Sequence, residues 1–162
     1  MKLYTMQAKP ESFEQRLDLA VEEVFGTMLG VSCAPVEAVG WTTRQETIGA
    51  IVGMAGAMRG SCVVHVSRAS GMRIAELLTG KADNDQGMAQ DALGELCNMI
   101  AGTWKGGIPE LASGCMLSPP VVIEGYDFRL HSQPSPFHIQ SRYQFGPDEL
   151  DVTLHGEMGK PV

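Results

Sequence analysis

Basic residues are scarce in this sequence and do not cluster. The 162 residues include 12 Lys and Arg against 19 Asp and Glu, which gives a formal net charge of −7 at pH 7. Proteins that bind nucleic acids need clustered Lys and Arg to neutralise the phosphates. The composition therefore excludes nucleic acid from the partners that we expect for this chain.

Cysteine pairs at metal-binding or redox spacing are also missing. The four cysteines stand at positions 33, 62, 97 and 115, too far apart for a zinc knuckle or a Cys-x-x-Cys redox pair. The four histidines show no ligand spacing on a single helix. Scattered single cysteines are typical of small buried side chains in a reducing compartment. We expect no metal site in this chain.

Long apolar runs are absent as well. The longest uncharged apolar-rich run, Ile48 to Met58, is too short to cross a bilayer. The N-terminal segment MKLYTMQAKPESFEQ lacks the apolar stretch of a secretory signal. Hydrophobic residues make up 44% and charged residues 19% of the chain, the balance of an ordinary globular domain. We expect a cytoplasmic protein with no membrane segment, folded as one domain over residues 1–162 with its core at about 10–156.

Helical periodicity occurs in three segments of the chain. Apolar residues recur there at three- and four-residue steps, which predicts the helices Glu11–Leu29, Ser70–Leu78 and Met88 to about Trp104. Ser12 is the expected N-cap of the first helix, and Gly30 stands where a C-cap glycine belongs. Gly80 ends the second predicted helix.

Short β-rich runs broken by glycine and proline fill the rest of the chain. Gly125 marks one predicted tight turn, and Gly146-Pro147-Asp148 marks another. Because the runs come in hairpin-linked groups, they favour an antiparallel sheet. The predicted fold is α+β, a mainly antiparallel sheet with three helices packed on it. The predicted strands are Val36–Thr43, Glu46–Met54, Arg59–Val66, Met116–Glu124, Tyr126–Ser132, Phe137–Phe145 and Glu149–His155.

The third predicted helix has a polar stripe opposite its apolar one. At about 100° per residue, Asp91, Glu95, Asn98 and Gly102 fall within an arc of roughly 60°. Glu95 and Asn98 are three residues apart, so their side chains project from one patch. Gly94 and Gly102 are expected to leave this patch open to another protein. The opposite, core-facing stripe consists of Ala89, Leu93, Leu96, Cys97, Ile100 and Trp104.

An ordinary solvated face is the simpler interpretation of such a stripe, because every amphipathic helix has a polar side. Gly94, Asn98 and Gly102 are nevertheless poor helix formers, and each interior glycine costs about 1 kcal/mol relative to alanine. A sequence that keeps three weak helix formers around one exposed patch indicates that the patch is used.

Residues 92–102 read Ala-Leu-Gly-Glu-Leu-Cys-Asn-Met-Ile-Ala-Gly. This segment resembles the Glu-x-x-Asn signature of the CheC/CheX/FliY family. Other parts of the chain resemble the same family in the same order: residues 24–30, 53–61, the Ser-Pro-Pro-Val-Val run at 118–122, and 137–154. The agreement in order and spacing covers roughly residues 10–156. It implies a CheX/CheC-like fold for the whole predicted domain.

The resemblance also implies an activity, dephosphorylation of the aspartyl phosphate on a CheY-like response-regulator receiver domain. By motif position Asn98 would orient the attacking water, and Glu95 would contact the active-site lysine of the receiver. Asp91, Gly94 and Gly102 would border the partner-binding surface. The Mg²⁺ would belong to the receiver, so the chain would need no cofactor of its own. The pathway would be chemotaxis or another two-component system.

CheC-type members carry the signature on two helices, and this chain departs from that pattern. Glu22 is present on the first predicted helix, but Phe25 stands where an Asn would be needed. One catalytic patch per chain is therefore expected, as in CheX-type members. The resemblance to these members also implies that two copies of this chain form a homodimer. Candidate edge strands are Val36–Thr43 and the segment after Pro136. The Trp104-Lys105 pair that follows the signature is unfamiliar in the family.

The alternative function is a non-catalytic module that binds receivers or flagellar-switch proteins.

Overall fold

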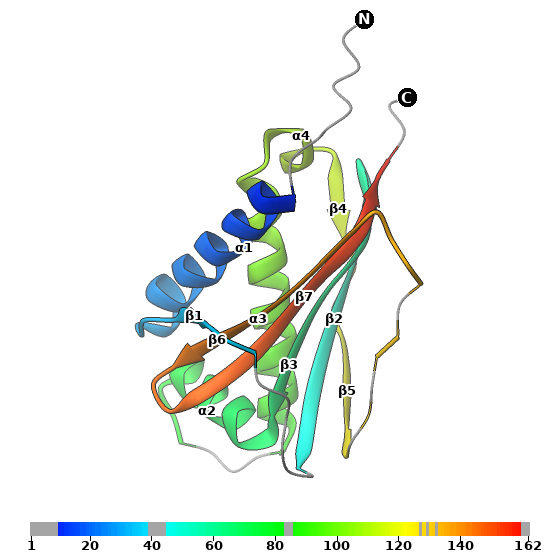
Figure 1. The fold of residues 1–162 in the computed structure, drawn as a ribbon. Helices are drawn as coiled ribbons and strands as arrows, with labels where there is room; N and C mark the ends of the chain where they lie inside the picture. Colours follow the sequence, from blue (N-terminus) through cyan, green and yellow to red (C-terminus); the bar gives the residue numbers. More distant parts are fainter. Residues whose placement is uncertain are drawn as a thin grey trace, which may run out of the picture.

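Seven antiparallel strands form one sheet, and the helices pack on one of its faces (Figure 1). The computed structural model describes residues 10–38, 45–82, 86–126, 128, 130, 131 and 133–159. The helices in this part of the chain are α1 (Pro10–Val24), the π-helical turn η1 (Phe25–Leu29), α2 (Arg68–Thr79), α3 (Gln86–Gly106) and α4 (Pro109–Ala112). The strands are β1 (Ala34–Val36), β2 (Glu46–Gly56), β3 (Met58–Ser67), β4 (Cys115–Leu117), β5 (Val121–Tyr126), β6 (Phe137–Phe145) and β7 (Asp148–Met158).

The strand order is β1-β6-β7-β3-β2-β4, and β5 also pairs with β2. All the described pairings are antiparallel. One side of β2 pairs with β3, while its other side pairs with β5 at residues 46–51 and with β4 at residues 54–56. The predicted α+β fold with a mainly antiparallel sheet is confirmed. The short helix α4 is additional to the three helices predicted.

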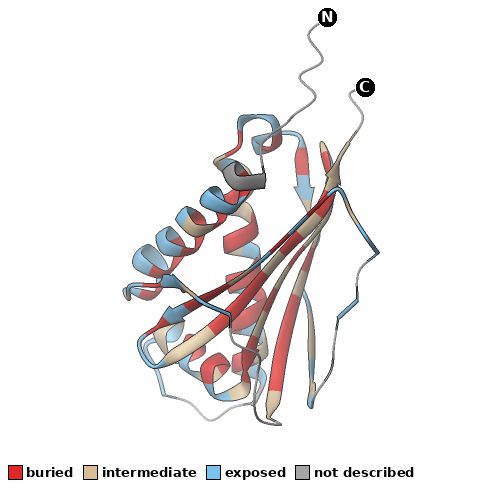
Figure 2. Cartoon of the chain, viewed as in Figure 1, coloured by how far each residue is buried: buried red, intermediate tan, exposed pale blue. Residues whose placement is uncertain are grey.

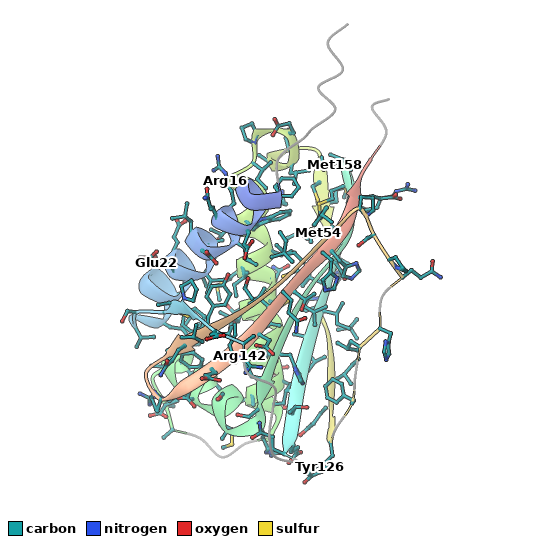
Figure 3. The ribbon with its side chains drawn as sticks, in the orientation of Figure 1. Arg16, Glu22, Met54, Tyr126, Arg142 and Met158 are labelled. Carbon is teal, nitrogen blue, oxygen red and sulfur yellow. The ribbon has the colours of Figure 1, made fainter. Side chains whose placement is uncertain are left out.

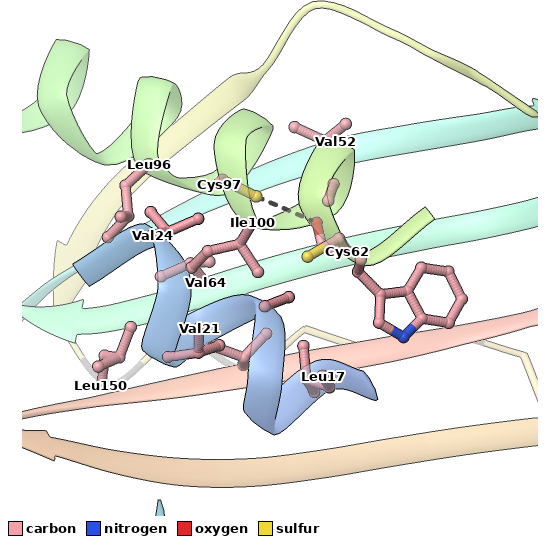
Figure 4. Close-up of a cluster of buried hydrophobic side chains, with 14 of the residues drawn as sticks. Leu17, Val21, Val24, Val52, Cys62, Val64, Leu96, Cys97, Ile100 and Leu150 are labelled. Carbon is pink, nitrogen blue, oxygen red and sulfur yellow. Dashed lines mark hydrogen bonds between the residues drawn. The ribbon is translucent and has the colours of Figure 1, made fainter. Parts of the chain in front are cut away.

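Alternate residues of the central strands face the helices and form the core together with them (Figure 2). The predicted core stripe of α3 is buried in full, from Ala89 to Trp104. Cys97 lies against the sheet, where its thiol donates to the carbonyl oxygens of Cys62, at 3.4 Å, and Ala50, at 3.5 Å (Figure 4). The buried face of α3 therefore fixes which side of the helix looks outward.

The first residues of α1 and α2 differ from the predicted ones, because apolar periodicity does not mark the residue that caps a helix. Pro10 and Glu11 are already helical, so Ser12 lies inside α1 and is not its N-cap. The N-cap of α2 is Ser67, whose side chain accepts a hydrogen bond from the backbone N–H of Ser70 at 3.1 Å. Ser70 is therefore the third residue of this helix rather than its start. The C-caps Gly30 and Gly80 are confirmed, with φ angles of 71° and 72°.

Strand predictions failed mainly around residues 116–132. Two short strands replace the predicted strand 116–124, because Pro119 and Pro120 lack the N–H groups that would continue the pairing with β2. Gly125 lies inside β5 opposite Thr47 and not in a turn. Beyond Tyr126, the described residues of the predicted strand 126–132 are not in a strand, and residues 127, 129 and 132 lie outside the described part.

The predicted turn at residues 146–148 is confirmed, because it joins the paired strands β6 and β7. The strands β2 and β3 likewise pair as a hairpin across residues 56–58. Of the predicted strand 36–43, Val36 ends β1, and residues 39–44 lie outside the described part of the chain. Among the residues that the structure describes, no helix is long and apolar enough to cross a membrane.

Candidate functional site

The outward face of α3 carries the residues that the sequence singled out. Asp91, Glu95 and Asn98 are exposed, and Gly102 is half-buried. The helix presents them on the side away from its core contacts with α1, β2 and β3, so the polar stripe is open to solvent. Glu95 and Asn98 therefore share one accessible patch on a helix whose opposite side is packed tightly.

Gly94 lies differently from the expectation. It is buried, and a Cβ atom added there would lie 3.3 Å from Cγ of Pro120 and 3.5 Å from Cγ2 of Val122. The glycine therefore accommodates the chain's own segment between β4 and β5, and the expectation that it leaves the patch open is wrong. At Gly102 an added Cβ would meet only Leu117, at 3.9 Å, which is an ordinary contact distance.

The segment between β4 and β5 forms one border of the exposed patch. Gly94, Asn98 and Gly102 follow one another at four-residue steps, so they lie along one side of α3. Gly94 approaches Pro120, and Gly102 approaches Leu117. The side chain of Asn98 consequently emerges from α3 beside the residues between Leu117 and Pro120. No periodicity in the sequence pointed to this neighbourhood.

A polar network holds the N-terminal half of α3 against β5. Nε2 of Gln90 donates to Oε2 of Glu124 at 2.5 Å, and Arg68 forms ion pairs at 2.8 Å with both Glu124 and Glu46. The hydrogen bond from Arg68 lowers the pKa of Glu46. Glu124 is therefore bonded to both α3 and Arg68. These four residues come from four separate elements, so sequence spacing contains no signal for the network.

The patch is polar and acidic, with two carboxylates and one amide. The amide of Asn98 offers both a hydrogen-bond donor and an acceptor at any physiological pH. The carboxylate of Glu95 can pair with a cation on another molecule. In the described part of the chain, no group of three His, Cys, Asp or Glu side chains is placed to hold a metal ion. The amide and the carboxylates of the patch are able to position a water molecule and to pair with an opposite charge.

The position of a second signature on α1 holds no polar pair. Glu22 is exposed (Figure 3), but Phe25 is fully buried, with its ring centroid 5.0 Å from that of Phe145. Trp104, which follows the signature, is also buried and donates to the carbonyl oxygen of Phe13 at 3.1 Å. It therefore belongs to the core and not to the surface beside Asn98.

Comparison with known proteins identifies a family. The family model described as chemotaxis phosphatase CheX matches residues 48–141, which is more than half of the chain and includes Glu95 and Asn98. A curated relative, the CheY-P phosphatase CheX of Thermotoga maritima, is 27% identical over 84 residues. The aligned part makes up 51% of this chain and 54% of the relative, so the chain spans about half the length of the relative that it matches.

Solved structures share the fold at low sequence identity. The crystal structure of the chemotaxis protein CheX from Vibrio vulnificus has a TM-score of 0.75 at 21% identity, covering 91% of this chain and 98% of its own. CheX in the CheX-CheY-BeF3-Mg²⁺ complex from Borrelia burgdorferi has a TM-score of 0.73 at 18% identity, covering 89% and 97%. These two structures agree with the family model in fold. The match over residues 48–141 shows that the chain belongs to the chemotaxis phosphatase CheX family.

Proposed function

We propose that this chain is a phosphatase that removes the phosphoryl group from the aspartyl phosphate of a CheY-like receiver domain, in chemotaxis or another two-component system. The observation that carries the proposal is the exposure of Glu95 and Asn98, three residues apart on one rigidly packed helix, in a member of this family. The reaction class is hydrolysis.

Asn98 is proposed to orient the water that attacks phosphorus. Phosphoryl transfer needs mainly positioning and charge stabilisation from the protein, with little covalent chemistry. An exposed amide can enter the active site of a docked partner and hold a water through its donor and acceptor. The phosphorylated Asp and the Mg²⁺ would belong to the receiver, so for the orientation of the water α3 needs to supply only the amide.

Glu95 is proposed to pair with a lysine at the receiver's active site and thereby to fix the docking position. Asp91 and Gly102 border the same surface and would contact the partner. Gly94 is buried under Pro120, so its contribution would come through packing inside this chain. Two relatives support a receiver as the partner: the Thermotoga maritima protein is named a CheY-P phosphatase, and the Borrelia burgdorferi structure holds CheX together with CheY.

The working form is proposed to be a cytoplasmic homodimer. What supports a dimer is an incomplete edge of the sheet, because β1 pairs with β6 only at residues 142–144. No described strand lies beside residues 137–141 on that side of β6. Unpaired N–H and C=O groups at a sheet edge are able to pair with another chain.

A phosphate-release assay tests the activity. Receivers encoded beside this chain would be phosphorylated with a small-molecule phosphodonor and followed with and without the purified protein. The protein should raise the rate of phosphate release from at least one receiver well above that receiver's own rate. Glu22→Ala, a change of an exposed glutamate on α1, should leave this rate unaltered. Binding of a phosphorylated receiver without acceleration would instead support the non-catalytic binding module.

A further inference from the structure

The middle of α3 contains a glycine that the helix itself does not need. Glycine is the weakest helix former apart from proline, and Gly94 occupies an interior position of a 21-residue helix. An added Cβ there would lie 3.3 Å from Cγ of Pro120, which is closer than most contacts of real Cβ atoms. The close approach of α3 to Pro120 is the physical reason for a glycine at this position.

Pro120 belongs to a bridge, residues 118–120, that is fixed to β2. The backbone N–H of Ser118 donates to the carbonyl oxygen of Gly53 at 2.9 Å, and the N–H of Gly53 donates to Oγ of Ser118 at 2.8 Å. Ser118 thus bonds both the N–H and the C=O of Gly53. This residue lies between the part of β2 that pairs with β5 and the part that pairs with β4. Oγ of Ser118 also donates to the carbonyl oxygen of Pro119, at 3.1 Å.

The two prolines make this bridge stiff. A proline ring fixes φ near −65°, so two successive prolines leave residues 119 and 120 little freedom to move. One end of the bridge is fixed by Ser118, and the other continues directly into β5, which pairs with residues 46–51 of β2. Pro120 therefore presents a rigid surface to Gly94. The spacing between α3 and the sheet edge is set at this contact.

Asn98 is one helical turn from Gly94, on the same side of α3. If the distance of α3 from the sheet edge changes at Gly94, or if the helix rotates there about its axis, the amide of Asn98 moves relative to the rest of the surface. A misplacement of about 1 Å in a positioning group can cost on the order of a hundredfold in rate. The network of Gln90, Glu124 and Arg68 holds the preceding turn to β5, so a shift at Gly94 is not absorbed on that side.

We infer that Gly94 and Pro120 are positioning residues of the candidate site. Their contact holds α3 at the distance from the sheet edge at which Asn98 reaches the phosphoryl group of a docked receiver. This inference rests on the proposed phosphatase function. Neither residue needs to contact the partner for this role. The bridge acts on the reaction through Asn98 alone.

A double-mutant cycle on Gly94→Ala and Pro120→Ala tests the inference. In Gly94→Ala the new methyl group would lie 3.3 Å from Cγ of Pro120. Because the bridge is stiff, we expect α3 to move away by a few tenths of an ångström, while alanine favours the helix and keeps the protein folded. We expect kcat to fall about tenfold with KM within about twofold. Pro120→Ala removes Cγ, the nearest atom, and leaves Cβ of residue 120 at 3.4 Å, an ordinary contact distance. The double variant should therefore recover to within about threefold of Pro120→Ala alone. Gly106→Ala, on the same helix with nothing within 4 Å of an added Cβ, is the matched control.

A second readout keeps the test decisive if the wild-type protein has no activity. The side-chain NH₂ resonances of Asn98, assigned by their loss in Asn98→Asp, report where this amide lies in the free protein. They should shift in Gly94→Ala, return toward their wild-type positions in the double variant, and stay unchanged in Gly106→Ala. Unshifted resonances in Gly94→Ala would overturn the positioning role. A loss of turnover that Pro120→Ala does not relieve would overturn it as well. An inactive wild type that shows the expected shifts would refute the proposed function but leave the positioning of Asn98 standing.

Discussion

Among single residues, Asn98 carries the greatest part of the proposed chemistry. Its side chain is exposed on α3, so its truncation removes no core contact. We expect Asn98→Ala to lower the rate of receiver dephosphorylation about a hundredfold or more, because a water that is no longer positioned raises the barrier by several kcal/mol. Thermal unfolding should match the wild type. An unchanged dephosphorylation rate in this variant would exclude the amide from the reaction.

Glu95 is expected to act in docking. Truncation of a charge that is buried against an opposite charge in an interface commonly costs about 2–5 kcal/mol of binding free energy. We expect a loss in this range for Glu95. Glu95→Ala should therefore weaken the affinity for a phosphorylated receiver and lower turnover together. Glu22→Ala removes an exposed glutamate on α1 and serves as the control. Equal affinities of the wild type and Glu95→Ala, measured by titration calorimetry, would contradict the docking role.

His155 should make the stability depend on pH. It lies on the face of the sheet away from α3, with Nε2 2.5 Å from Oγ of Ser61, His138 as the neighbouring ring, and the Arg59–Glu157 ion pair next along the strands. Burial, followed by the positive charge of His138, lowers the pKa of His155 below its ordinary value of 6.5. The unfolded chain therefore takes up a proton first as the pH falls.

The consequence is a loss of stability on the acid side. The contribution of His155 is present in full above about pH 6.5 and is lost as the pH falls from there through the lowered pKa. Denaturant unfolding of His155→Gln should show a flatter dependence of the unfolding free energy on pH below 6.5 than the wild type does. His131→Gln, at an exposed position, should keep the wild-type slope. The same slope for wild type and His155→Gln would show that this histidine does not contribute.

At the scale of the elements, Trp104 ties α3 to α1. Its ring stacks edge-on against Phe13, and its indole N–H donates to the buried main chain of that residue. Trp104→Phe removes the donor and part of the buried ring, so the unfolding free energy should fall by about 1–3 kcal/mol. Lys105→Ala removes a hydrogen bond to the carbonyl oxygen of Ala112 at the surface and should change it by less than about 0.5 kcal/mol. Equal midpoints and slopes for Trp104→Phe and the wild type in urea would contradict this anchoring role.

The elements also differ in how far their sequence predicted them. The core stripe of α3 could be predicted because 3.6-residue periodicity is a local property of the chain. The hairpin of β6 and β7 could be predicted from alternation and a turn of glycine, proline and aspartate. The division of the predicted strand 116–124 could not, because it depends on how β2 is shared between β4 and β5. The ion pairs of Arg68 join residues that only the folded sheet brings together.

At the scale of the whole molecule, the open edge of β6 leads to a prediction of the assembly. We expect a homodimer, with a mass of twice the 17.4 kDa of the chain, in light scattering coupled to size exclusion. A two-fold dimer would leave the Asn98 patch of each protomer free for its own receiver. A mass near 17.4 kDa throughout the micromolar range would show a monomer. Prolines at positions 119, 120, 134 and 136 would then be the features that protect its sheet edges.

The sequence by itself determined the α+β class, the helix that carries the candidate site, and the side of that helix on which Glu95 and Asn98 stand. These follow from local periodicity, in which each residue's environment depends on neighbours three or four positions away. Only the tertiary structure decided why Gly94 is a glycine and what lies beside Asn98. The reason is physical: a close approach between α3 and Pro120 depends on how the bridge is bonded to Gly53, and the spacing of residues along the chain contains no information about that distance.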